Sequence, residues 1–270
     1  LAGDGADELF AGYRMYQGEY LAKYYSILPD IMKEKIIEPF INFLPGSREK
    51  KHSEYIRRLK KFTNGMSGSL AERFYGWQEI FSPGTRQKLI KHHLQDGISF
   101  QAGQEIISQK LSELAGDNIN RMLYVDVKNS LPGDMLTKVD LMSMRNSLEV
   151  RVPFLDHEVV ELAFEMEGSV KLKGLKRKYI LMETFKDILP PMLHNRPKWG
   201  FEMPIGAWLR RELKFLIDDF LSRDFVNKQG IFEYDIIDGL IKKHMSKKMD
   251  YSLQLWNLIV FQHWHKRYFS

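Results

Sequence analysis

Apolar side chains recur at helical spacing along most of this sequence. Residues 148–152 are the exception, because Leu148, Val150 and Val152 alternate with polar neighbours and predict a short extended piece. The pattern as a whole predicts a mainly α protein. The expected helices lie near 31–37, 117–131, 135–144, 156–164, 178–188, 204–222, 233–246 and 250–267.

Residues with the chemistry of helix starts and stops stand at several boundaries. Ser82 precedes Pro83, a pairing typical of an N-cap and a first helical residue. Asp117 and Asp156 can each accept a hydrogen bond from the first free N–H groups of the following helix. The Pro132-Gly133 pair is expected to stop the helix that Asp117 begins.

The helix expected over 135–144 carries apolar residues on several faces, which predicts a buried helix in the middle of the domain. Charged residues run from Asp134 to Asp156, and burying them costs free energy unless they are paired. Salt bridges are the favoured interpretation, and a substrate-facing role for Asp134 or Lys138 is left open. The expected pairs join Arg145 or Arg151 to Glu149 or Asp156.

The first residues gather Asp4, Asp7 and Glu8 with Gly3 and Gly5 where a helix begins, which is expected to continue unbroken to position 15. Glycines let backbone approach a ligand closely, and free N–H groups at a helix start favour anions. Carboxylates beside an anion suit a divalent cation that bridges the two. Helix capping, with Asp4 as N-cap and Asp7 in the first turn, is the alternative that residue types alone favour.

A second candidate is the segment 196–201, Arg-Pro-Lys-Trp-Gly-Phe. Lys198, held by stiff backbone after a proline, suits a phosphate or a developing negative charge. The alternative, which residue types favour somewhat, is a surface loop whose aromatic side chains anchor it to the core.

Composition narrows the classes of function. The chain has 270 residues and a net charge of +5, and its basic runs, such as Lys171–Lys178, are typical of solvated surfaces. Aromatic and basic residues do not alternate over a sheet-like stretch, so no nucleic-acid partner is expected. The absence of cysteine excludes disulfides and thiolate catalysis and is compatible with a reducing cytoplasm. No apolar run approaches the ~20 residues that span a membrane, and the histidine spacing offers no shared metal site.

Together, the motifs resemble the synthetase domain of the glutamine-dependent asparagine synthetases over essentially the whole chain. The residues that carry the resemblance are, in order, Gly3-Asp4-Gly5-Ala6-Asp7-Glu8-Leu9-Phe10, Lys138-Val139-Asp140, Ser143-Met144, Leu148 to Asp156, Leu189-Pro190, Arg196-Pro197-Lys198 and Gly200-Phe201. The resemblance implies the helical carboxy-terminal part of an α/β domain of the adenine-nucleotide alpha-hydrolase-like (N-type ATP pyrophosphatase) fold, with residues 1–270 as one partial domain.

The resemblance also implies roles for the matching amino-terminal residues. Gly3 and Gly5 would lie beside the nucleotide, and Asp7 would help hold magnesium on the pyrophosphate. Asp4 takes an acidic position near the acyl-adenylate where many relatives have glutamate. Glu8 stays open between first-turn electrostatics and support of the site.

Further along the chain, Lys198 matches a lysine that stabilises charge on the phosphates. Asp134 and Lys138 are expected near the nucleotide, whereas Arg151 and Asp156 are interpreted as structural.

The implied chemistry has two steps. ATP and Mg²⁺ activate the side-chain carboxylate of aspartate as an AMP ester, and ammonia derived from glutamine then displaces AMP to give asparagine. The resemblance implies a cytoplasmic enzyme with an amino-terminal glutaminase domain in the same protein, and leaves its oligomeric state open.

Three departures from the family pattern qualify this expectation. The pyrophosphate loop Ser-Gly-Gly-x-Asp-Ser is absent, as are the glutaminase domain and its nucleophilic cysteine, and Met182 stands where many relatives carry arginine. The sequence also begins at Leu1, so a fragment that is inactive by itself is expected. The alternatives are a related ATP-dependent amidotransferase with another carboxylate substrate, and a non-catalytic helical module derived from such an enzyme.

Overall fold

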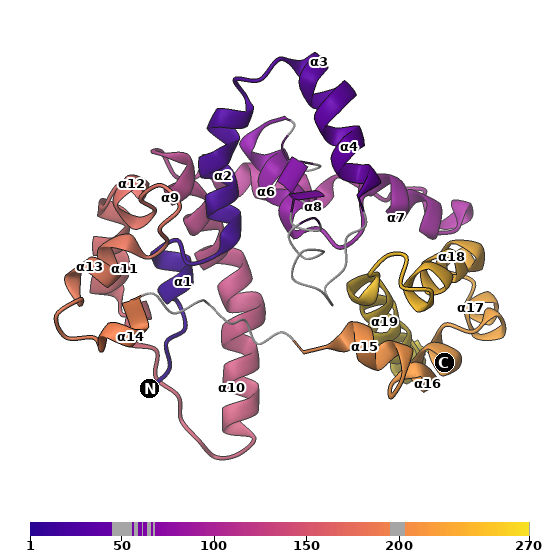
Figure 1. Cartoon of the computed structure of the whole chain (residues 1–270). Helices are drawn as coiled ribbons and strands as arrows, with labels where there is room; N and C mark the ends of the chain where they lie inside the picture. The colour runs from indigo at the N-terminus through magenta and orange to yellow at the C-terminus, as the bar shows by residue number, and fades with distance from the viewer. Residues whose placement is uncertain are drawn as a thin grey trace. The chain divides into compact units, whose positions relative to one another are not determined.

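The computed structural model describes residues 1–44, 56, 59–60, 62–63, 66, 68–194 and 203–269, which fall into two compact units (Figure 1). Helices dominate both units, so the expectation of a mainly α chain is confirmed. In the described residues, β pairing is limited to two isolated bridges, Ile90 with Phe232 and Lys173 with Lys176. Unit 1 comprises Leu1–Pro29, Met66–Trp77 and Gly103–Lys198, and unit 2 comprises Asp30–Gly65, Gln78–Ala102 and Trp199–Ser270.

Unit 1 holds the amino-terminal motif. Its short first helix buries Leu9 and the following Phe10 against Ala163, with Phe154 and Leu155 packed around them. The helices are α1 (Ala6–Leu9), α2 (Arg14–Tyr25), α6 (Leu70–Gln78), α8 (Ala102–Ser112), α9 (Asn118–Val125), the π-helix η3 (Asp126–Leu136), α10 (Thr137–Met144), the 3₁₀ turn η4 (Pro153–Leu155), α11 (His157–Glu165), α12 (Gly168–Lys171), α13 (Tyr179–Thr184) and α14 (Pro191–His194).

Unit 2 has its core around the last helix, where Leu255, Leu258 and Ile259 are buried among side chains of the neighbouring helices. The helix expected near 250–267 is confirmed as α19, and it packs in this core. The helices of the unit are α3 (Asp30–Met32), the π-helix η1 (Lys33–Ile37), α4 (Glu38–Phe43), α7 (Pro83–Leu89), the 3₁₀ turn η2 (His92–Leu94), α15 (Ile205–Arg210), α16 (Lys214–Phe220), α17 (Arg223–Gln229), α18 (Tyr234–Met245) and α19 (Ser252–Phe269).

Three of the expected helix caps are confirmed. The Ser82 hydroxyl accepts a hydrogen bond from the Thr85 N–H, with Pro83 as the first residue of α7. Asp117 caps α9 and Asp156 caps α11 in the same way. Each side chain satisfies an N–H that has no partner within its own helix.

The expected stop at Pro132 is wrong. The chain stays helical from α9 through η3 into α10, with Pro132 inside η3. In π-helical winding each N–H bonds to the carbonyl five residues back, which accommodates a proline that an ordinary α-helix would exclude. The Pro132 carbonyl accepts a hydrogen bond from the Thr137 hydroxyl at 2.7 Å.

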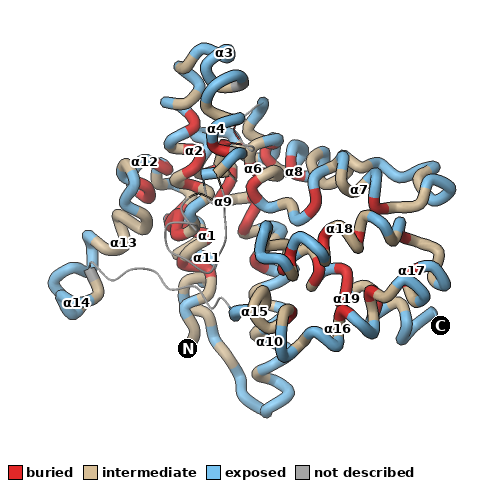
Figure 2. The backbone as a smooth tube through the Cα atoms, turned by 45° about the vertical axis from the view of Figure 1, so that its right-hand side comes forward, coloured by how far each residue is buried: buried red, intermediate tan, exposed pale blue. Residues whose placement is uncertain are grey.

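The expected burial of the 135–144 helix is also wrong. No residue of α10 is buried, and Leu141, Met142 and Met144 are all exposed (Figure 2). The apolar residues of this segment lie on several faces of the helix. Such a pattern predicts that a helix forms, but it does not show which neighbouring elements would bury those faces.

Two further boundaries differ from expectation. The extended piece at 148–152 forms no strand, although the Arg151 carbonyl accepts a hydrogen bond from the Ala2 N–H at 2.9 Å. The helix expected over 204–222 is split into α15 and α16, because the backbone leaves the helical region at Arg211.

Within the described chain, no helix has both the length and the apolar character needed to cross a bilayer.

Leu255 and Leu253 on α19 provide a matched pair, since Leu255 is fully buried and Leu253 is 41% exposed. We expect Leu255→Ala to lower the free energy of unfolding by about 2–5 kcal/mol, because a cavity remains in the core of unit 2. Leu253→Ala is expected to change it by less than about 0.5 kcal/mol. Urea unfolding followed by circular dichroism measures both, and equal losses would refute this placement of α19.

Candidate functional site

The amino-terminal motif starts its helix at a glycine rather than at an aspartate. Gly5 is the N-cap of α1 with φ 90°, and no side chain caps the helix. The expected N-cap role of Asp4 is therefore wrong, because the backbone turns at the next residue, in a region that favours glycine. A Cβ on Gly5 would also lie 2.4 Å from Cδ2 of Leu155. Asp4 is left half-exposed beside exposed Gly3, and Asp7 lies in the first turn as expected.

The motif helix is short, so the expected continuous helix is wrong. The chain turns between α1 and α2, with Ala11 at φ 56°. A Cβ on Gly12 would lie 1.7 Å from Oδ1 of Asp7, so any larger residue at this position would push the Asp7 carboxylate aside. The turn brings the backbone against the carboxylate of Asp7.

Asp7 forms an ion pair with Lys178, whose Nζ lies 3.1 Å from Oδ1. Both side chains are about a quarter exposed, at 25% and 26%. Two hydrogen bonds join the turn after α1 to residues 177–178. The Lys178 N–H donates to the Phe10 carbonyl at 3.0 Å, and the Arg177 guanidinium donates to the Gly12 carbonyl at 2.9 Å.

More than one cation surrounds this carboxylate. Burial lowers the pKa of the Arg177 guanidinium, the charge of Arg14 lowers it further, and Asp7 opposes both effects. Arg177 and Lys178 thus set two positive charges against the single charge of Asp7, and Arg14 acts on Arg177. Such an excess of positive charge favours an anion with several oxygens. Sequence reasoning missed Lys178 and Arg177, whose only signal was the basic run interpreted as a solvated surface.

Glu8 faces the interior, unlike its neighbour Asp7. It is only 3% exposed, and it accepts a hydrogen bond from the Tyr13 hydroxyl at 2.5 Å. Burial is the largest cause of the raised pKa of Tyr13, and the hydrogen bond to Glu8 adds to it. Glu8 therefore joins α1 to the start of α2 from the inside.

The other expected ligands of the nucleotide lie on η3 and α10. Asp134 and Lys138 are both exposed, and the Lys138 ammonium lies 3.6 Å from the sulfur of Met135. No hydrogen bond or ion pair between the described residues joins either one to Asp7. Asp134 and Lys138 thus belong to the same unit as Asp7 but are not bonded to it.

Among the charged residues after α10, Arg151 pairs with Glu149, which confirms one of the expected salt bridges. Both side chains are mostly exposed, so the pair does not offset a buried charge. Asp156 serves as the cap of α11, consistent with the structural role expected for it. Lys198 and the rest of the 196–201 segment lie outside the described residues.

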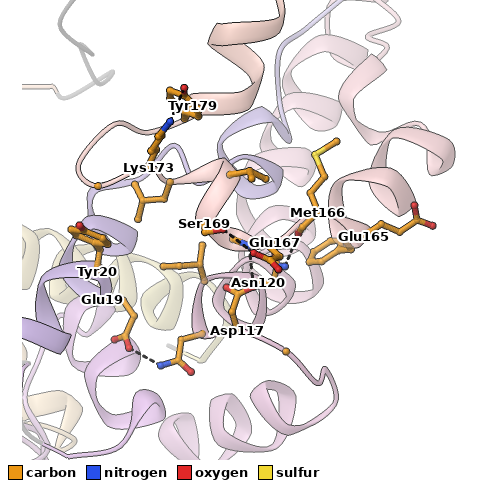
Figure 3. A pocket seen from close by; sticks show the side chains of 18 of the residues that line it. Glu19, Tyr20, Asp117, Asn120, Glu165, Met166, Glu167, Ser169, Lys173 and Tyr179 are labelled. Atoms are coloured by element: carbon orange, nitrogen blue, oxygen red, sulfur yellow. Dashed lines mark hydrogen bonds between the residues drawn. The ribbon is translucent and has the colours of Figure 1, made fainter.

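A separate pocket of 1010 Å³ opens elsewhere in unit 1 (Figure 3). Lys173 reaches toward Tyr179 at one edge, and Glu19 lies near Tyr20 on another wall. Asn120 lines the pocket, and buried Lys171 donates to its side-chain oxygen at 2.7 Å; burial lowers the pKa of this lysine to about 8. No candidate from the sequence lines this pocket.

The described residues contain no cluster of three or more side chains able to hold a metal ion. Asp7 and Asp4 are the partly exposed carboxylates that the described residues place at this motif, and Asp7 lies against a lysine. Mg²⁺ is commonly held by one or two carboxylates together with phosphate oxygens and water. The residues present therefore fit a magnesium ion that arrives with a polyphosphate, and fit a lone ion poorly.

The sequence matches the asparagine synthase family over residues 1–266. The chain belongs to this family. It is 31% identical over 265 residues to asparagine synthetase [glutamine-hydrolyzing] 1 of Bacillus subtilis, covering 98% of this chain and 40% of that protein. It is 30% identical over 266 residues to a putative asparagine synthetase of Mycobacterium bovis, with 98% and 38% covered.

More distant similarity extends to the amidase chyE of Penicillium rubens, at 23% identity over 92% of this chain and 38% of that protein. The 270-residue chain spans about two fifths of the length of the curated relatives that it matches. No solved structure matches it, so the nucleotide-binding α/β architecture stays a prediction.

The pairing of Asp7 with Lys178 can be measured by a double-mutant cycle on unfolding. We expect Asp7→Asn and Lys178→Met to show a coupling of roughly 0.5–1 kcal/mol, as for a partly exposed ion pair. Adding Gly12→Ala should abolish the coupling, because its Cβ displaces the carboxylate.

Gly133→Ala is the matched control, since a Cβ there meets nothing within 4 Å. The coupling should survive in that background. A coupling that also survives Gly12→Ala would contradict the geometry of the turn.

Proposed function

We propose that this chain supplies one side of the active site of an asparagine synthetase. The complete enzyme would use ATP to activate the side-chain carboxylate of aspartate as an AMP ester, releasing pyrophosphate. Ammonia from glutamine would then displace AMP to give asparagine. The observation that carries the proposal is Asp7, held at a glycine-started helix beside Lys178 and Arg177, in a chain matched to the family over residues 1–266.

The amino-terminal residues would act on the phosphates of ATP. Asp7 would be the protein ligand of Mg²⁺, and the metal would neutralise the charge that develops as pyrophosphate leaves. Lys178 lies 3.1 Å from Asp7, so its ammonium group would bind the phosphates that carry the magnesium ion. Exposed Gly3 would let the backbone before α1 approach the nucleotide, buried Gly5 would fix the turn that starts α1, and Asp4 would lie at the acyl group.

Three residues from other segments would complete this side of the site. Lys198 would stabilise negative charge on the phosphates during formation and use of the AMP ester. Asp134 and Lys138, both exposed in unit 1, would contact the nucleotide. Aspartate, glutamine-derived ammonia, a glutaminase domain in the same protein and a cytoplasmic location belong to the same proposal.

A second candidate is an amide-forming enzyme of the same family with another carboxylate substrate. The observation that favours it is the similarity to proteins named as amidases, chyE of Penicillium rubens and chry2 of Gibberella zeae, at 23% and 22% identity. The third reading is a helical module without catalysis. Nothing in the Asp7 turn selects the acyl group, because its charges suit the phosphates that both enzymes share.

The 270-residue chain contains no Ser-Gly-Gly-x-Asp-Ser segment to bind pyrophosphate. We therefore expect the purified chain alone to catalyse no aspartate-dependent exchange of radiolabelled pyrophosphate into ATP. Robust exchange by the chain alone would show that it holds a complete site and would overturn this part of the proposal.

In a protein that joins this chain to such a loop, exchange should depend on aspartate. We expect Asp7→Asn and Lys178→Met each to lower the exchange rate roughly 100-fold, because each removes charge stabilisation of the phosphates. Asp96→Asn and Lys176→Met, which change exposed side chains, should leave the rate unchanged. Exchange with other carboxylates but not aspartate would select the second candidate, and no exchange with any carboxylate would select the helical module.

A further inference from the structure

Asp126 is a buried carboxylic acid that the proposed chemistry does not use. It begins η3, is 1% exposed, and accepts a hydrogen bond from the Tyr16 hydroxyl of α2 at 2.5 Å. The Ser130 hydroxyl, one turn further along η3, donates to its other oxygen at 3.1 Å. Three side chains from two helices thus meet at one buried carboxyl group.

The surroundings of Asp126 are acidic. The charged group that acts on it is Glu8 of α1, itself buried, and no lysine or arginine in the described chain contributes to its titration. Tyr16 and Tyr13 are the neighbouring titratable hydroxyls, and Asp126 raises the pKa of both. A buried carboxylate without a cation is costly, and a second carboxylate nearby increases that cost.

We propose that Asp126 is kept as the neutral acid and that Asp126, Tyr16 and Ser130 form a buried, proton-holding latch between η3 and α2. Neutral Asp126 accepts from the Tyr16 hydroxyl through one oxygen. When the carboxyl is neutral, the Ser130 hydroxyl, which donates to the ionised form, rotates to accept the proton on the other oxygen. Loss of the proton leaves a buried negative charge that no lysine or arginine of the described chain neutralises, which lowers the stability of the fold even though both hydroxyls can still donate to the carboxylate. This latch goes beyond the proposed function and stands whether or not the chain acts on ATP.

The titration supports this geometry. Burial raises the pKa of Asp126 to about 7, Glu8 adds to the rise, and the hydrogen bonds from Tyr16 and Ser130 oppose it. A carboxyl whose pKa is higher in the folded than in the unfolded state stabilises the fold fully only below its unfolded value. That stabilisation is lost as the pH rises to about 7.

The latch matters for the segments that it joins. Through Tyr16 it holds α2, which follows directly on the turn around Asp7. Through Ser130 it holds η3, which carries Asp134 and continues into α10. Asp126 is thus a positioning residue, because from the interior it holds both α2, which follows the Asp7 turn, and η3, which carries Asp134.

The direct test is a carbon-13 titration of the aspartate carboxyl groups in the purified chain, with Asp126→Asn used for assignment. We expect the Asp126 signal to titrate near pH 7. Tyr16→Phe should move that midpoint higher, because it removes a hydrogen bond that favours the ionised form. An Asp126 that is fully ionised at pH 5.5 overturns the proposal, and Tyr16→Phe supplies the assignment where Asp126→Asn does not fold.

Thermal unfolding between pH 5 and 8 tests the consequence for stability. The unfolding midpoint of the wild-type chain should fall as the pH rises through this range, and Asp126→Asn should remove that part of the fall because its amide never ionises. Asp96→Asn, on an exposed loop, is the control and should keep the wild-type profile. A profile of Asp126→Asn identical to that of the wild type also refutes the latch.

Hydrogen exchange separates a latch from an isolated buried acid. With intrinsic rates corrected for pH, Tyr16→Phe should speed exchange roughly tenfold or more for amides of α2 and η3 together. Faster exchange confined to α2, with η3 unchanged, would mean that Asp126 does not join the two helices.

Discussion

The turn from Phe10 to Gly12, fixed by Arg177 and Lys178, decides what the amino-terminal carboxylates can do. The two basic residues donate to backbone carbonyls of the turn, and Lys178 also pairs with Asp7. A residue near the start of the sequence thereby meets one about 170 positions later. Without that long-range contact, Asp7 would be an ordinary acidic residue in the first turn of a helix.

The same short helix places two successive acids in opposite environments. Asp7 lies at a partly exposed surface among cations, whereas Glu8 is buried with Tyr13 and near Asp126. The outer side suits phosphates and a metal ion that come together. The inner side joins α1, α2 and η3 through hydroxyl–carboxyl hydrogen bonds. The motif thus combines the proposed site for anions with the interior contacts that hold it in place.

Local chemistry explains which parts of the fold the sequence could predict. Ser82, Asp117 and Asp156 cap helices as expected, because a cap depends only on the few residues that follow it. Asp4 failed as a cap because Gly5, with its positive φ, takes the boundary. Pro132 failed as a stop because π-helical winding accommodates it, a choice that depends on packing along the whole segment.

The candidate site was only partly predictable for the same reason. Resemblance to known synthetases picked out Asp7, but no local pattern could show that Lys178 would be its partner. The apolar pattern of α10 predicted a helix correctly and its burial wrongly, because burial depends on which neighbours are present. The family was predictable, because the motifs follow one another in the family's order along the chain, and the match over residues 1–266 confirms it.

The central claim is that Asp7 and Lys178 together bind a magnesium-bound polyphosphate. A phosphorus-31 titration of the purified chain with magnesium pyrophosphate tests it most directly. We expect line broadening or a shift with the wild-type chain that is lost in both Asp7→Asn and Lys178→Met, and little binding of Mg²⁺ without pyrophosphate. Equal binding of magnesium pyrophosphate by the wild type and both variants would contradict it.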